Sequence, residues 1–247
     1  MSFGLWHCGY PDRSARARDR AVADSRQLGH AHTLAYALNY AGRAAVIARD
    51  VATARSYGND CVAIASEHGF ARWAALGRIL QGWADAQKGQ ATTGIAQIRE
   101  GLAADEAIGT RLTRPLYLAL LAEALALVGK IEEGLATLDD ALAQAAVSGE
   151  KGYNAEIHRL RGELTGRLPY PDPAKAEASF RTALAIARDQ GTRGYELRAA
   201  TSLAWLWREQ GRRDEARDLL SPVYGWFSEG FETVDLKDAK ALLDKLA

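Results

Sequence analysis

Apolar residues recur three and four positions apart along most of the chain, with polar residues between them. Leu135, Leu138 and Leu142 show this spacing, and Leu116, Leu120 and Leu127 follow it at intervals of four and seven. Such spacing gathers the apolar side chains on one face of an α-helix, whereas a half-buried strand alternates at every second residue. The pattern predicts a helix over 12–28 and then paired helices at 31–48 and 51–67, 70–88 and 91–107, 111–128 and 131–148, 151–166 and 173–190, and 193–210 and 213–228.

A glycine follows the second helix of each pair, and these glycines keep a regular interval. They stand 40, 40, 40 and 42 residues apart, at Gly29, Gly69, Gly109, Gly149 and Gly191. Glycine commonly ends a helix because it adopts positive φ without a steric penalty. A period of this length is typical of stacked helical hairpins. We therefore expect an all-α, right-handed α-solenoid of about a dozen helices, with a helix content of about 80% and no strand of consequence.

Small residues keep the same period and predict where the two helices of a pair touch. Gly82 and Gly162 lie on the first helix of their pairs, and Gly94 and Ala176 lie on the second. We expect each pair to face one another, because small side chains let two helix backbones approach closely.

The two ends of the chain differ in how they relate to the repeats. Residues 1–28 correspond to the second helix of a repeat alone, which has the pattern of a cut end, and residues 29–230 hold five repeats. Residues 231–247 predict a capping helix that begins at Asp235 and buries Leu236 and Leu242 over the last repeat. We expect one continuous domain.

The helix at 12–28 lacks the first helix of its repeat, so its apolar stripe at Val22 and Leu28 needs a cover. An uncovered apolar surface on a solenoid tends to find a partner. The sequence predicts that Leu5 and Trp6 fold back over this stripe, or that a second copy of the chain covers it in a homodimer.

Composition narrows the classes of partner. The 247 residues include 31 basic and 31 acidic side chains, so the formal net charge is zero and gives no bulk attraction for nucleic acid or an anionic membrane. The two cysteines, Cys8 and Cys61, form no disulfide framework and suit a reducing compartment. No apolar run reaches membrane-spanning length and no signal-peptide pattern opens the chain, so we expect a cytoplasmic location.

The motifs of common catalytic and cofactor sites do not occur in the sequence. No glycine-rich phosphate loop precedes Lys-Ser or Lys-Thr, and no Gly-x-Ser-x-Gly elbow occurs. His30 and His32 diverge on a helix, and no cysteine pair accompanies them as in a zinc site. We expect no catalytic residue, no cofactor and no metal.

The candidate binding surface is the concave side of the solenoid, which we expect the first helix of each repeat to line. Trp83 and Trp205 directly follow small packing positions, and Arg159 and Glu163 lie on one helical stripe. These charges could instead form a salt-bridge ladder between repeats, and that alternative stays open. Mixed charge with two indoles suits a peptide better than a duplex. The candidate residues are Arg43, Trp83, Glu123, Arg159, Glu163, Arg198, Trp205 and Arg208.

Several stretches resemble known repeat proteins. The Ala-x-x-x-Phe-x-x-Ala pattern at Ala176, Phe180 and Ala183 resembles tetratricopeptide repeats. The stretches 156–164, 176–184, 196–204 and 211–246 are similar to the C-terminal helical tail of bacterial multidomain regulators that carry a class III adenylate or guanylate cyclase or a signalling ATPase. This resemblance implies a regulatory or sensing tail, and no catalytic residue of those enzymes has a counterpart here.

The sequence thus favours a non-enzymatic module that binds a protein or peptide partner or senses an effector, and that regulates signalling domains attached to it in a larger bacterial protein. Domains of its own parent chain count among these partners. Two alternatives remain open. The chain could be a self-association module, or a repeat domain with an embedded small-molecule or hydrolytic site, which would show as a deep pocket of converging ionisable groups.

Overall fold

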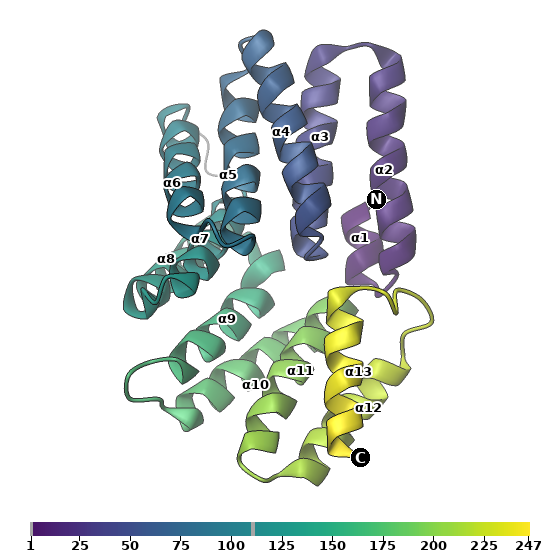
Figure 1. Ribbon diagram of the computed structural model, residues 1–247, viewed down its shortest axis with the longest axis vertical. Coiled ribbons are helices and arrows are strands. Elements are labelled where there is room, and N and C mark those ends of the chain that lie inside the picture. Colours follow the sequence, from purple (N-terminus) through teal and green to yellow (C-terminus); the bar gives the residue numbers. More distant parts are fainter. Residues whose placement is uncertain (1, 110–111) are drawn as a thin grey trace. The chain divides into compact units, whose positions relative to one another are not determined.

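The computed structural model describes residues 2–109 and 112–247. The chain is 82% helical, with 13 helices in repeats and no strand among the described residues. The prediction of an all-α solenoid of tetratricopeptide-like helix pairs is confirmed. Contacts divide the chain into two compact units (Figure 1). Unit 1 contains residues 1–2 and 15–148, and unit 2 contains residues 3–14 and 149–247.

Unit 1 consists of helical hairpins whose predicted helices are all present. Its helices are α2 (Pro11–Leu28, whose first turn belongs to unit 2), α3 (Ala31–Ile47), α4 (Val51–Glu67), α5 (Ala71–Gln87), α6 (Ala91–Ala107), α7 (Arg114–Leu127) and α8 (Ile131–Ser148). The predicted start of α7 at residue 111 lies outside the described residues.

Unit 2 combines the second half of the chain with its first residues. Its elements are α1 (Ser2–His7), the 3-10 helix η1 (Lys151–Tyr153), α9 (Asn154–Gly166), α10 (Pro173–Asp189), α11 (Arg193–Glu209), α12 (Arg213–Gly225) and α13 (Val234–Leu246). The sequence pattern did not predict α1.

The first helix of each hairpin lies on one side of its unit. We call α3, α5, α7, α9, α11 and α13 the A helices, and α4, α6, α8, α10 and α12 the B helices. From α3 to α11, each A helix packs on the B helix that follows it, and α13 packs on α12. Among the A helices, α3 also contacts α5, α5 contacts α7, α9 contacts α11, and α11 contacts α13. Among the described residues, no two B helices pack on each other in this way. The A helices therefore pack on one another along one side of each unit, which we call its inner side.

The glycines act as expected at the helix ends and in part inside the hairpins. All five periodic glycines have positive φ, for example 70° at Gly69. A Cβ on Gly82 would lie 2.6 Å from the carbonyl oxygen of Gly94, so these two backbones do touch. Gly162 instead makes room for the ring of Phe180, one turn beyond the predicted contact at Ala176. The hairpin α9–α10 therefore packs glycine against a phenyl ring.

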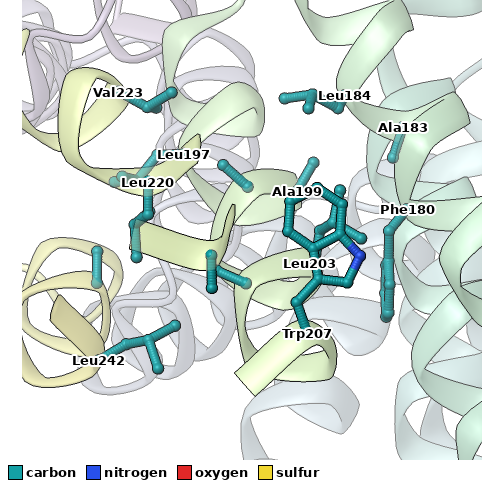
Figure 2. Close-up of a cluster of buried hydrophobic side chains, with 14 of the residues drawn as sticks. Phe180, Ala183, Leu184, Leu197, Ala199, Leu203, Trp207, Leu220, Val223 and Leu242 are labelled. Atoms are coloured by element: carbon teal, nitrogen blue, oxygen red, sulfur yellow. The ribbon is translucent and has the colours of Figure 1, made fainter. Parts of the chain in front are cut away.

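The core of unit 2 centres on α11. Leu197 and Leu203 of this helix are buried between α10 on one side and α12 and α13 on the other. Figure 2 shows the Trp207 ring next to Phe180, with Leu220 on the opposite side of the cluster. One continuous apolar cluster thus holds four helices together.

At the chain ends, one prediction stays open and one is wrong. The Trp6 ring packs against Gly194 and Tyr195 within unit 2, and cover of the α2 stripe by Leu5 and Trp6 or by a second copy stays a prediction. Asp235 does not begin α13, since the helix starts at Val234 and the Asp235 carboxylate accepts hydrogen bonds from Arg198. A buried cation outweighs the capping preference of the aspartate here. The homodimer and the single continuous domain stay predictions.

Candidate functional site

The candidate residues lie on the A helices. Arg43, Trp83 and Glu123 occupy equivalent positions on α3, α5 and α7, 40 residues apart in sequence. Arg159 and Glu163 lie on α9, and Arg198, Trp205 and Arg208 lie on α11. The first three belong to unit 1 and the other five to unit 2, so each set is described by itself.

In unit 1, α3 presents an aromatic and cationic stripe. Tyr36, Tyr40 and Arg43 are four and three residues apart, which places them on one face of the helix. The two phenol rings stack with centroids 4.4 Å apart, and the guanidinium of Arg43 lies 4.9 Å from the Tyr40 ring. Tyr36 is 45% exposed, although it is a large aromatic residue.

Trp73 of the neighbouring helix α5 packs beside these rings and is 8% exposed. Trp73 meets the Tyr36 ring edge-on at 5.6 Å, and its indole N–H donates to Nε2 of His32 at 3.0 Å. We call Tyr36, Tyr40, Arg43 and Trp73 the unit-1 stripe. The hydrogen bond that the Tyr36 hydroxyl shares with Tyr40, followed by burial, raises the pKa of Tyr36 above its ordinary value.

Of the three candidate residues in unit 1, Trp83 and Glu123 are joined by a hydrogen bond. The indole N–H of Trp83 donates to Oε2 of Glu123 at 2.8 Å, which links α5 to α7. Trp83 is only 2% exposed. The sequence predicts that Trp83 contacts a partner, whereas its buried position in the structure suits packing between repeats.

A buried polar layer lies among the same A helices. Asn39 falls between Tyr36 and Arg43 on the same face of α3, is fully buried, and has no hydrogen-bond partner for either amide atom among the described residues. The buried hydroxyl of Tyr117 on α7 also has none, and burial raises the pKa of Tyr117 to about 12. Since buried polar groups in native proteins are nearly always hydrogen-bonded, these groups indicate room for a further bonding partner.

In unit 2 the charged candidates form an ion-pair network. Arg159 donates to both carboxylate oxygens of Glu156, at 2.9 and 2.8 Å, and also bonds to Glu163. Arg198 donates to both oxygens of Asp235, at 3.0 and 2.8 Å, and reaches Glu156 at 3.3 Å. The network joins α9, α11 and α13, which corresponds to the salt-bridge ladder that the sequence left open.

Both arginines of this network are buried. Arg159 and Arg198 are 4% and 6% exposed. Burial alone would lower the pKa of Arg198, but the charges of Asp235 and Glu156 raise it above its ordinary value. Both guanidinium groups are thus committed to carboxylates of their own unit, which leaves them poorly suited to hold a ligand carboxylate.

The last two candidates lie together near the end of α11. The guanidinium of Arg208 lies 4.6 Å from the Trp205 ring, and the ammonium of Lys245 on α13 lies 4.9 Å from the same ring. Trp205 is half-buried between these two cations. This pair remains accessible at the inner side of unit 2.

Three further features of the described residues concern metal binding, cysteine reactivity and membrane insertion. Across residues 2–109 and 112–247, no group of three or more histidine, cysteine, aspartate or glutamate side chains is placed to hold a metal ion. Burial, with the charge of Asp60, raises the pKa of the Cys61 thiol to about 12, which suppresses the thiolate. None of the helices in the described part of the chain is both long and apolar enough to cross a bilayer.

Sequence reasoning missed the unit-1 stripe, apart from Arg43. The corresponding positions of the next two repeats hold leucine, at Leu76 and Leu80 and at Leu116 and Leu120, so the repeat pattern by itself does not distinguish Tyr36 and Tyr40 from core positions. A comparison of residue types at equivalent positions would have shown that only the first repeat has aromatic residues there.

No known protein family matches the sequence. An uncharacterised protein of Rhizobium meliloti (strain 1021) is 28% identical over 203 residues, which is 82% of this chain and 20% of that protein. The chain thus spans about a fifth of the length of the curated relative it matches.

Solved structures of tetratricopeptide-like repeat proteins share the fold. A Rap protein complexed with Competence and Sporulation Factor superposes with a TM-score of 0.69 at 16% identity, over 96% of this chain and 69% of that one. A kinesin light chain-like protein of Podosopora anserina with nearly identical TPR-like repeats gives 0.52 at 17% identity, over 87% of this chain and 97% of its own. At such identities the likeness shows the fold alone.

Proposed function

We propose that this chain is a non-enzymatic interaction module that binds a peptide segment of a partner protein along the unit-1 stripe. The observation that carries the proposal is the exposure of Tyr36 beside Tyr40, Arg43 and Trp73 on the inner side of the A helices. Tetratricopeptide-like repeats are typically non-enzymatic, and the Rap neighbour supports a peptide or protein as the class of partner.

The composition of the stripe resembles that of the energetic centre of an interface. Tyrosine, tryptophan and arginine are the residues most enriched among those that dominate binding energy. Tyr36 and Tyr40 offer large rigid surfaces, and they lose little rotamer freedom on binding because they already stack on each other. Arg43 adds a positive charge beside them.

The buried layer beneath the stripe suggests what the ligand supplies. A primary amide such as that of Asn39 offers both a donor and an acceptor, as a peptide group does. A bound peptide backbone that reached Asn39 would therefore satisfy both of its amide atoms. An acidic or aromatic side chain of the ligand would complement Arg43 and the stacked rings.

The proposed regulatory role rests on length and resemblance. The curated relative is several times longer than this chain, and the tail-like stretches of the second half resemble the ends of multidomain regulators. In such a protein, a partner bound to the unit-1 stripe changes the activity of cyclase or ATPase domains carried on the same polypeptide.

The test is selection of peptides from a phage-displayed random library on the immobilised chain, followed by calorimetric titration. Tyr36→Ala should weaken binding of the selected peptides by about tenfold or more, because a central aromatic anchor is lost. Tyr170→Ala provides a matched control, since Tyr170 is 91% exposed and lies in a loop of unit 2. Equal affinity for both variants, or a library without binders, would contradict the proposal.

A further inference from the structure

The first residues of the chain belong to unit 2, although the whole of unit 1 separates the two in sequence. Residues 3–14 pack with residues 149–247, and the chain then continues through α2 into unit 1. We call residues 2–14 the N-terminal segment. It contains α1, which has six residues and is too short to be stable by itself, and the first turn of α2. Contacts with unit 2 must therefore hold it in place.

One side chain anchors this segment. Trp6 is 5% exposed, and its ring lies edge-on to Tyr195 at 5.0 Å and against the guanidinium of Arg198 at 4.9 Å. A Cβ on Gly194 would come within 2.6 Å of the same ring, so only glycine admits the indole there. The space left over beside Trp6 is about 10 Å³. We call this site, formed by Gly194, Tyr195 and Arg198, the tryptophan slot.

The rest of the segment is fixed to the turn before α13. The carboxylate of Asp12 accepts from the backbone N–H of Gly230 at 3.0 Å, and Arg13 pairs with Glu229 at 3.1 Å. Pro11 lies so close to Gly230 that a side chain at residue 230 would clash with it. The segment thus presents a tryptophan and, five residues later, a Pro-Asp pair to complementary groups of unit 2.

The tryptophan slot is part of the inner side of unit 2. Tyr195, Arg198, Ser202 and Trp205 follow each other at intervals of three, four and three on α11, which places them on one face. This face corresponds to the face of α3 that carries the unit-1 stripe. The N-terminal segment therefore covers one end of a surface that the fold otherwise presents to partners.

We infer that the N-terminal segment is a displaceable internal ligand of unit 2, and that a partner peptide bearing a tryptophan takes over the tryptophan slot when it binds. The inference rests on the proposed peptide-binding function and extends it to a second site. One buried aromatic anchor with exposed polar contacts around it is how a short peptide binds a preformed surface. The contacts of Trp6 and Asp12 define the chemistry that a competing peptide must supply.

The test measures binding of the chain's own segment in trans. A fluorescein-labelled peptide with the sequence of residues 2–14 is titrated against the full chain and against its Trp6→Ala variant, and anisotropy reports the complex. The peptide should bind the variant at least about tenfold more tightly than the wild type, because the tethered tryptophan no longer fills the slot. A peptide carrying the same Trp6→Ala change should not bind.

A second substitution locates the site. Adding Gly194→Leu to the Trp6→Ala chain places a side chain where the indole lay, and should abolish peptide binding while preserving the fold. Tyr36→Ala in that background should leave binding unchanged, so a failure at the tryptophan slot is distinguished from a failure of the unit-1 stripe. Equal affinity for wild type and Trp6→Ala, or no binding to a folded Trp6→Ala chain, would overturn the inference.

Hydrogen exchange decides the matter if Trp6→Ala does not fold. In the wild type the amides of Cys8, Gly9 and Tyr10 donate to carbonyls within the segment. A displaceable segment detaches while the rest of unit 2 stays folded. These amides should therefore exchange at least about a hundredfold faster than those in the centre of α11. Exchange of both sets at the same rate would show that the segment is an inseparable part of the core.

Discussion

Replacing Arg198 by methionine should destabilise unit 2 severely. Arg198 is 6% exposed and Asp235 is 8% exposed, so both charges lie out of water. In Arg198→Met, Asp235 loses hydrogen bonds of 3.0 and 2.8 Å, while Glu156 keeps its two bonds from Arg159. Removing one partner of a buried ion pair costs about 3–5 kcal/mol. In a chain of this size, that loss lowers Tm by roughly 10 °C.

The assay is thermal and urea unfolding of Arg198→Met, Asp235→Leu and the double variant. The double variant should be more stable than Arg198→Met, with a coupling energy of about 2 kcal/mol or more, because no orphaned carboxylate remains at residue 235. Arg208→Met serves as the control on the same helix. Arg208 is half-buried and stacks on Trp205, so its loss should cost about 0.5–1 kcal/mol.

Two results would refute this reasoning. If Arg198→Met lies within about 1 kcal/mol of the wild type, the ion pair contributes nothing that packing does not replace. If the double variant is no more stable than Arg198→Met, the cost does not come from the carboxylate of Asp235. If Arg198→Met is as stable as the wild type but no longer binds the peptide, Arg198 contacts the ligand.

Three further outcomes follow from the packing and charges. Leu203→Ala should cost about 2–5 kcal/mol in urea unfolding, because Leu203 is buried in the core of unit 2, whereas Tyr170→Ala at an exposed site should stay within about 0.5 kcal/mol. Gly194→Val should expel the Trp6 ring and raise its quenching by acrylamide; unchanged quenching would contradict the contact. Burial, and then the charge of Arg198, lower the pKa of His7, so its contribution to stability is full above its ordinary value of 6.5 and is lost as pH falls through the lowered value. Between pH 7 and 5 the wild type should therefore lose more stability than His7→Gln, and parallel pH profiles would argue against this.

The periodic features of the fold could be predicted because they depend on local chemistry. Glycine at positive φ ends each hairpin whatever surrounds it, and apolar spacing defines each helix. The contact between Gly162 and Phe180 was missed by one turn, because the small-residue pattern fixes which helices meet but not which side chain enters the gap. Helix identity was thus predictable, and the detailed packing was not.

Contacts between distant segments leave no local pattern. Trp6 and Gly194 lie in different halves of the chain, and nothing near either residue marks the other as its neighbour. The charged stripe of α9 and α11 was visible at helical spacing, but the commitment of Arg198 to Asp235 depends on where α13 packs. The Tyr36–Tyr40 pair occurs in one repeat, so the features common to all repeats do not indicate it.

The most direct test of the central claim is a ¹⁵N–¹H spectrum of the six tryptophan indoles during titration with a peptide selected from the library. Trp73 belongs to the unit-1 stripe, whereas Trp207 lies in the core of unit 2. The account predicts that the Trp73 resonance shifts on binding, that the Trp207 resonance does not, and that Tyr36→Ala abolishes the shift. A saturable complex that leaves Trp73 unmoved would contradict it, because the peptide would then bind away from the inner side of the A helices.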